Sequence, residues 1–182
     1  MLRYLGNFYQ QRNPRVLFDG LRRIRDARPD LLDGMRIELI GPQITPQRWE
    51  TEAAGLPLHC RGAVSYLDSL RLMRGADALL VIDADFDRNV FFPSKLVDYL
   101  GARRPLLAIT MPGTTADIVS AAGGFVAMAN DPESVAAGLR QLLDALVCGT
   151  AAVPDPQAVA YYAAPRVAAE FDALLEELVV HR

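Results

Sequence analysis

The sequence predicts a doubly wound α/β domain built on a mostly parallel, six-stranded sheet. Short apolar runs suited to buried strands alternate with helical patterns along the 182 residues, and no internal repeat is present. Such alternation places helices on both faces of a parallel sheet. The length suits one domain that buries most of the surface its unfolded chain exposes.

The first half of the chain contains three short apolar runs, which predict strands over residues 2–5, 35–40 and 56–60. Pro14 takes the favoured first position of a helix that reaches about Ala27. Its inward stripe is expected to comprise Val16, Leu17, Gly20, Leu21 and Ile24. A short helix over 46–54 should turn Trp49 inward. Ser65 caps a helix to about Arg74, with the core-facing residues Tyr66, Leu67, Leu70 and Met73.

The second half continues the alternation with strands expected over 78–82, 105–109 and 125–129. Pro93 and Ser94 open a helix between the first two, with Leu96, Tyr99 and Leu100 facing the core. Thr114 or Thr115 starts the next helix, which ends near residues 123–124. The run Asp131-Pro132-Glu133 is a strong helix start, and that helix should continue to about Val147.

The end of the chain differs in composition from the rest. Residues 149–165 are rich in alanine and proline and indicate a linker, and 166–180 form a last helix. The apolar stripe of that helix is Val167, Phe171, Leu174, Leu175 and Leu178. We therefore expect a domain over 1–148, with the linker and terminal helix of 149–182 packed on it.

Composition excludes several classes of protein. A net charge of −3 and a pI of about 5.4 argue against a broad nucleic-acid surface. Two cysteines make no disulfide framework and fit a reducing compartment, and no apolar run reaches the length of a membrane span. These observations predict a cytoplasmic protein.

Familiar site motifs are missing. The turn after the first strand reads Gly6-Asn7-Phe8-Tyr9, which lacks the GxGxxG pattern of dinucleotide sites, and no P-loop or GxSxG elbow is present. That turn offers Asn7 and no acid, unlike the magnesium site of a receiver domain. No metal-ligand spacing exists, and His59 is interpreted as structural. Asp83, Asp85 and Asp87 lack the glycine and distal glutamate of an EF-hand loop, so a solvated loop is expected there.

Lys95 stands out because it is the only lysine, against eighteen arginines. It lies in the first turn of its helix, where the helix macrodipole disfavours a cation. An anion such as a phosphate would be attracted by the lysine and by the helix N-terminus together. A solvated ion pair between Lys95 and Asp98, three residues apart, is the alternative. Arg12, in the loop after the first strand, could reach the same helix start and grip a diphosphate with Lys95. An exposed Arg12 without such a role is equally compatible with the sequence.

Four segments together resemble a known family. They are YLGNFYQQRNPRVLFDGL, RGAVSYLDSLRLMRGADALLVI, FFPSKLVDYLGARRPLLAI and YYAAPRVAAEFDALLEEL. They are similar to the carboxyl-terminal domain of GT-B glycosyltransferases, especially family 4 (glycosyl transferases group 1). The third segment carries the most specific motif. The resemblance implies a Rossmann-like half of a two-half enzyme, the half that binds the nucleotide-sugar donor, with a final helix that crosses back to the partner half.

The resemblance also implies roles for individual residues. Lys95, Ser94 and the helix start would hold the diphosphate, with Arg12 or Gly6 completing the cradle. Asp98 would accept hydrogen bonds from the ribose hydroxyls, and the backbone of Val64 would meet the nucleobase. The sequence departs from the family in two places: Val90 stands where many members have a glutamate, and Asp98 replaces the usual glutamate.

The implied reaction is transfer of a sugar from a nucleoside-diphosphate sugar to an acceptor, in polysaccharide or glycoconjugate biosynthesis, without a cofactor or metal. No catalytic residue is assigned. The amino-terminal, acceptor-binding half is absent from this sequence, so we expect the chain alone to be inactive. The resemblance leaves room for peripheral membrane association of the full protein. A sugar-nucleotide 2-epimerase-like domain and a non-catalytic interaction domain of the same fold are the alternatives.

Overall fold

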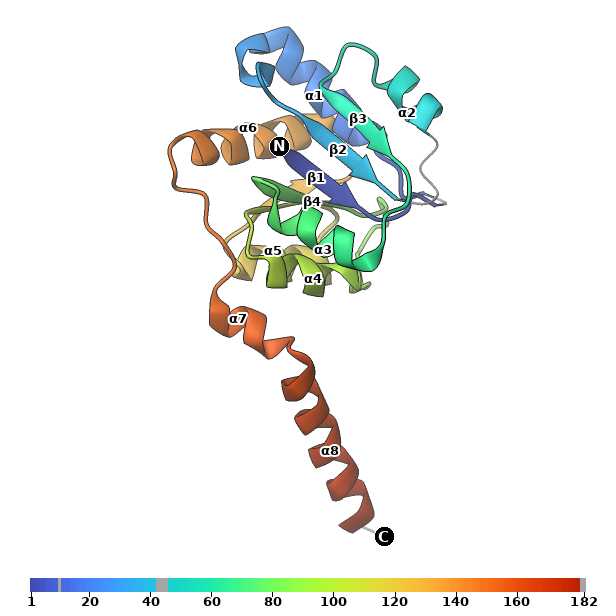
Figure 1. The fold of residues 1–182 in the computed structure, drawn as a ribbon, viewed down its shortest axis with the longest axis vertical. Coiled ribbons are helices and arrows are strands. Elements are labelled where there is room, and N and C mark those ends of the chain that lie inside the picture. Colours follow the sequence, from blue (N-terminus) through green and yellow to red (C-terminus); the bar gives the residue numbers. More distant parts are fainter. Residues whose placement is uncertain (10, 42–45, 181–182) are drawn as a thin grey trace.

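A computed structural model describes residues 1–9, 11–41 and 46–180. Six strands form one sheet in which every pairing is parallel. They are β1 (Leu2–Leu5), β2 (Ile37–Ile40), β3 (Leu58–Arg61), β4 (Ala78–Ile82), β5 (Leu106–Thr110) and β6 (Phe125–Met128). The strand order is β3-β2-β1-β4-β5-β6, which confirms the predicted doubly wound, Rossmann-like architecture (Figure 1).

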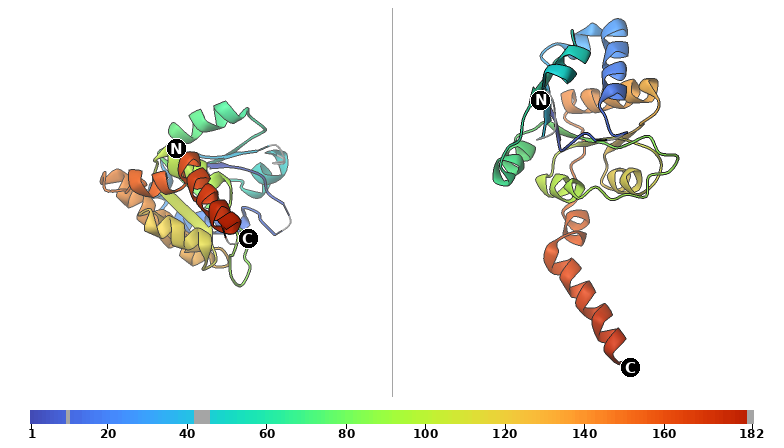
Figure 2. Two further views of the ribbon diagram at one scale, coloured as in Figure 1. Left: turned by 90° about the horizontal axis from the view of Figure 1, so that it is seen from below. Right: turned by 90° about the vertical axis from the view of Figure 1, so that its right-hand side faces the viewer.

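Helices cover both faces of the sheet (Figures 1 and 2). One face carries α1 (Arg15–Ala27), α6 (Pro132–Val147) and Trp49 of α2 (Pro46–Glu52), and the other carries α3 (Tyr66–Arg74), α4 (Lys95–Ala102) and α5 (Thr114–Ala121). A short 3-10 helix, Pro29–Leu32, follows α1. No helix in the described ranges is long and apolar enough to cross a membrane.

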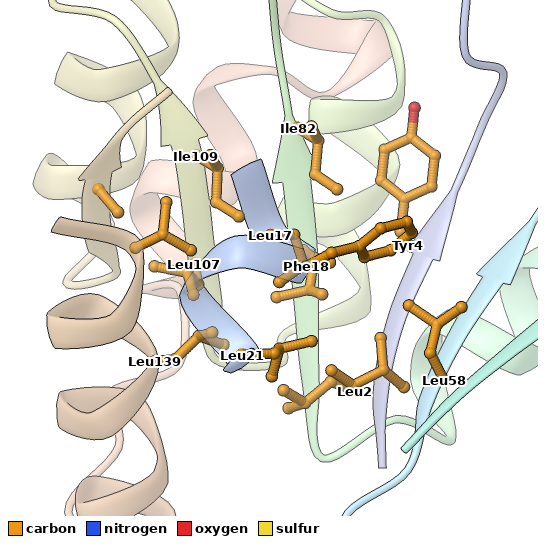
Figure 3. Close-up of a cluster of buried hydrophobic side chains, with 14 of the residues drawn as sticks. Leu2, Tyr4, Leu17, Phe18, Leu21, Leu58, Ile82, Leu107, Ile109 and Leu139 are labelled. Atoms are coloured by element: carbon orange, nitrogen blue, oxygen red, sulfur yellow. The ribbon is translucent and has the colours of Figure 1, made fainter. Parts of the chain in front are cut away.

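The larger core cluster lies between the sheet and helices α1 and α6. Figure 3 shows Leu17, Phe18 and Leu21 of α1 packed among side chains of the strands. Val16, expected in the inward stripe, is only partly buried, and Phe18 is buried instead. A Cβ on Gly20 would lie 2.7 Å from Val135 Cγ1, so glycine permits the close approach of α1 to α6.

The predicted inward face of α3 is wrong at its amino-terminal end. Met73 is buried and Leu70 partly so, but Tyr66 and Leu67 are each 63% exposed. The far end of the helix reaches β1, where Arg3 Nη1 donates to the Leu72 carbonyl at 2.7 Å. Periodicity identifies the apolar face of a helix, but not how much of that face a neighbouring element covers.

The segment after α6 also differs from expectation. Part of the predicted linker is a helix, α7 (Pro156–Tyr161), whose start repeats the Asp-Pro signal of α6: Asp155 accepts a hydrogen bond from the Gln157 amide at 2.6 Å. Tyr162 stacks on Phe92 with ring centroids 5.6 Å apart, so α7 packs on the domain.

The final helix, α8 (Ala164–Val180), leaves the domain (Figures 1 and 2). The expectation that it packs on 1–148 is wrong here, because its stripe residues Val167, Phe171, Leu174, Leu175 and Leu178 are all about half exposed or more. The short helix α7 packs against α4, and α8 follows α7 and contacts it.

Tyr99 ties α4 to the end of β1. Its fully buried hydroxyl accepts from the Leu5 amide at 2.7 Å and donates to the Leu5 carbonyl at 3.3 Å. Tyr99→Phe should lower the free energy of unfolding by about 1–3 kcal/mol, because it leaves buried backbone groups unsatisfied. Urea denaturation measures the change, with the exposed Tyr66→Phe as control, expected to stay within about 0.5 kcal/mol. Equal unfolding midpoints for the two variants would contradict this role.

Candidate anion-binding site

A cavity of about 610 Å³ opens at the carboxyl ends of β1 and β4. These two strands are neighbours, yet the chain proceeds from β1 to β2 on one side and from β4 to β5 on the other. Ligands of open α/β sheets bind at this reversal of strand order. The lining residues come from the segments after these two strands: Leu5, Gly6, Asn7, Tyr9, Gln11 and Arg12 after β1, and Ala84, Phe86, Phe91, Phe92, Pro93, Ser94 and Lys95 after β4.

Gly6 forms the turn on which the cavity rests. Its φ of +150° lies in a region that favours glycine, and its amide donates to the Ile40 carbonyl at 2.8 Å. A Cβ at this position would lie 2.9 Å from Lys95 Nζ. Glycine therefore lets the Lys95 ammonium lie directly against the backbone of the turn.

Lys95 extends from the first turn of α4 over the end of β1. Its Nζ lies 3.8 Å from the centroid of the Tyr4 ring, a cation–π contact. Burial, followed by the nearby Arg12 charge, lowers the pKa of Lys95 to about 7, and Asp83 opposes that shift. Burial also raises the pKa of Tyr4 well above its ordinary value, which leaves the phenol neutral.

The alternative of a solvated Lys95–Asp98 pair is wrong. No ion pair of Lys95 occurs among the described residues, and Asp98 instead accepts a hydrogen bond from the Tyr66 hydroxyl at 3.1 Å. The lone ammonium thus lies in the cavity with an aromatic face beneath it and no carboxylate paired to it. An incoming anion would supply the missing partner.

Arg12 reaches the same cavity from the loop after β1. Its Nη2 contacts Asp83 Oδ1 at 3.1 Å, and its Nη1 donates to the Tyr9 hydroxyl at 3.2 Å. The guanidinium also lies 5.1 Å from the centroid of the Tyr9 ring. Only 16% of the side chain is exposed, and Nε is buried without a hydrogen-bond partner among the described residues. The alternative of an exposed Arg12 is therefore wrong, and the expected convergence with Lys95 is observed.

Asp83 departs from the expected solvated loop. Its side chain is 2% exposed, and Oδ2 accepts from Asn89 Nδ2 at 2.6 Å and from Thr110 Oγ1 at 3.1 Å. Asp85 and Asp87 are exposed, as the solvated-loop prediction requires. In the part of the chain that the structure describes, no group of three or more His, Cys, Asp or Glu side chains is placed to hold a metal ion.

Ser94 lines the cavity, directly before α4, and its hydroxyl makes no capping bond to the helix. Asp98 does not line this cavity but a smaller hollow of about 310 Å³ between α3 and α4, lined also by Tyr66 and Arg74. Val64 is partly buried against the core near the start of α3 and lines neither hollow. The structure thus brings the four predicted phosphate contacts together and places the ribose and base candidates apart from them.

Sequence reasoning missed the aromatic residues around the cavity. Tyr4 lies beneath Lys95, while Tyr9, Phe86, Phe91 and Phe92 line the walls and are 39–58% exposed. Four of these five stand in the loops that follow β1 and β4. The sequence does carry a signal for them. These aromatic residues do not belong to the apolar pattern of any helix or strand, and they follow strands whose carboxyl ends are neighbours in the sheet.

The chain matches known proteins in structure but not in sequence. No family model and no curated protein sequence matches the chain. The glycosyltransferase WaaG, involved in lipopolysaccharide biosynthesis, is similar with a TM-score of 0.63 and 21% identity over 88% of this chain and 41% of WaaG. The pneumococcal O-GlcNAc transferase GtfA, solved with UDP and GlcNAc, has a TM-score of 0.67 and 11% identity over 98% of this chain and 36% of GtfA.

Anabaena HepE, solved with UDP, has a TM-score of 0.60 and 12% identity, with 82% of this chain and 40% of HepE covered. The chain therefore has the fold found in GT-B glycosyltransferases, which confirms the resemblance at the level of architecture. It spans about two fifths of the length of these proteins.

Proposed function

We propose that this chain is the nucleotide-sugar-binding part of a glycosyltransferase. The observation that carries the proposal is the convergence of Lys95, Arg12 and the Gly6 turn in one cavity at the reversal of strand order. Two cations, one of them without a carboxylate partner in the described part of the chain, suit the diphosphate of a nucleoside-diphosphate sugar. Two of the structural neighbours were solved with UDP, which supports this class of ligand.

The proposed chemistry uses the protein's own cations in place of a divalent metal. Negative charge develops on the departing nucleoside diphosphate as the bond between sugar and phosphate breaks. The Lys95 ammonium, the Arg12 guanidinium and the start of α4 would stabilise that charge at fixed positions. The buried acid of the site, Asp83, is already paired with Arg12, which leaves it unsuited to a metal.

We assign acceptor binding and the remaining catalytic groups to a further, amino-terminal domain outside this sequence. The support is that the chain covers only 36–41% of the neighbours described above. The likeness to WaaG supports a product of the polysaccharide or glycoconjugate class. On this proposal, the chain alone binds the donor and transfers little or no sugar.

Asp98 lines the hollow between α3 and α4 and not the cavity, and it stays the ribose contact that the family resemblance implies. The test of this role is discrimination between UDP and dUDP. Asp98→Ala should weaken UDP binding by about 1.5–3 kcal/mol and dUDP binding by less, because dUDP lacks the 2′-hydroxyl that would donate to the carboxylate. Titration calorimetry measures both affinities. Tyr66→Phe, which removes the hydroxyl now bonded to Asp98, is the matched control and should retain the preference for UDP. Equal losses for UDP and dUDP would refute the ribose contact.

A further inference from the structure

Asp83 is a buried carboxylate that forms an ion pair with Arg12. It does not line the cavity, and its two oxygens are held by different partners. Oδ1 contacts Arg12 Nη2 at 3.1 Å, while Oδ2 accepts from Asn89 and Thr110. Asn89 is itself 2% exposed, and its backbone is bonded to the start of α5 through the Thr114 amide at 2.9 Å. Two side chains, Asn89 and Thr110, thus hold the carboxylate in addition to the Arg12 guanidinium.

We propose that Asp83 is a positioning residue that holds the Arg12 guanidinium at the cavity for an anionic ligand. The inference rests on the proposed donor-binding function. Asp83 would not touch the ligand; its proposed role is to fix the Arg12 side chain, and its charge also favours the charged form of Lys95. Arginine has five N–H donors. Here Nη2 contacts Asp83 and Nη1 contacts Tyr9, while the buried Nε has no partner among the described residues and can still donate to a ligand.

Two opposing effects of Asp83 on binding follow from physical chemistry. Its charge partly neutralises Arg12, which would weaken attraction for a phosphate. Its rigid contact holds a long, flexible side chain in one place, which removes an ordering cost from ligand binding. Positioning is expected to prevail, because Asp83 is buried, whereas Tyr9, the other side chain that bonds to the guanidinium, is 52% exposed.

The test is a double-mutant cycle that uses UDP as the probe. Binding is measured by titration calorimetry near pH 6, to keep Lys95 charged, for wild type, Asp83→Asn, Arg12→Gln and the double variant. Asp83→Asn should weaken UDP binding about tenfold in wild type and less than about twofold in the Arg12→Gln background. Asp85→Asn removes the same charge from an exposed position in the same loop and should change the affinity less than about twofold.

The outcomes separate the inference from the function on which it rests. Equal weakening by Asp83→Asn in both backgrounds means that Asp83 only supports the fold, and tighter binding means that neutralisation prevails; either result overturns the inference. Absence of UDP binding by the wild type defeats the donor-binding proposal itself. Tight wild-type binding with an unchanged affinity in Asp83→Asn defeats the positioning role alone.

A second variant keeps the test decisive if Asp83→Asn does not fold. Asn at position 83 would place its amide opposite the Asn89 amide, which now donates at 2.6 Å. The exchange Asp83→Asn with Asn89→Asp restores a donor facing an acceptor while moving the carboxylate away from Arg12. Its UDP affinity should also be about tenfold below that of wild type. An exchange variant that folds and binds as tightly as wild type would contradict the inference.

Discussion

Lys95→Met should weaken UDP binding by about 1.5–3 kcal/mol, or roughly 10- to 150-fold, because it removes a charge-assisted contact to phosphate. The ammonium contacts the Tyr4 ring and the Gly6 turn and has no carboxylate partner among the described residues. Methionine has a similar length and no charge, so it fills the same space over the aromatic ring. The change therefore tests charge with little change in packing.

The control for this variant is a cation in the loop that precedes α4. Arg88 is exposed and does not line the cavity, so Arg88→Gln should change the UDP affinity by less than about twofold. Titration calorimetry of the two variants beside wild type separates a specific contact from a general effect of net charge. Equal affinities of Lys95→Met and wild type would remove Lys95 from the phosphate site.

The second large effect is a dependence of binding on pH. Burial and the Arg12 charge lower the pKa of Lys95 to about 7 in the free protein, so its ammonium is lost as the pH rises through that value. UDP-glucose is the suitable probe, because its two phosphates are diesters with a constant charge in this range. Its affinity should fall by about tenfold or more between about pH 6 and pH 8.5.

The same pKa shift has the opposite effect on stability: as the pH rises, ligand affinity falls but the free energy of unfolding increases. The folded-state pKa of Lys95 lies below its ordinary value of 10.5, so the unfolded chain binds more protons between the two values. The contribution of Lys95 to the free energy of unfolding therefore rises with pH from about 7 to 10.5. Lys95→Met should abolish the pH dependence of binding and remove the Lys95 contribution to that of stability, whereas His59→Gln, which removes the histidine in the described part of the chain, should leave both in place. A binding profile that stays flat in wild type would contradict the proposed ligand contact.

Much of the fold could be predicted because each element carries a local signal. The apolar runs of the strands and the starts of α1, α3 and α6 are short-range features of the sequence, and alternation of strands and helices then implies a parallel sheet. The position of α8 could not be predicted in this way. An apolar stripe shows that a helix has a face to bury, but the surface that meets this face is a property of the rest of the protein.

Part of the candidate site could likewise be predicted from the sequence, and part could not. The meeting of Gly6, Arg12 and Lys95 follows from strand order, because the loops after β1 and β4 share one edge of the sheet. The burial of Asp83 does not follow from local sequence. Asp83, Asp85 and Asp87 look equivalent in the sequence. The first of them is distinguished by its partners in the fold, which are Asn89, Thr110 and, 71 residues away, Arg12.

The most direct measurement uses the fact that the chain has a single lysine. Protein labelled with ¹⁵N and ¹³C at lysine alone gives one side-chain NMR signal, whose pH titration reports the Lys95 ammonium in the free protein and with saturating UDP-glucose. We expect a midpoint near 7 in the free protein that rises clearly when the ligand is added, because phosphate oxygens stabilise the charged form. The same midpoint with and without UDP-glucose would show that the diphosphate does not contact Lys95.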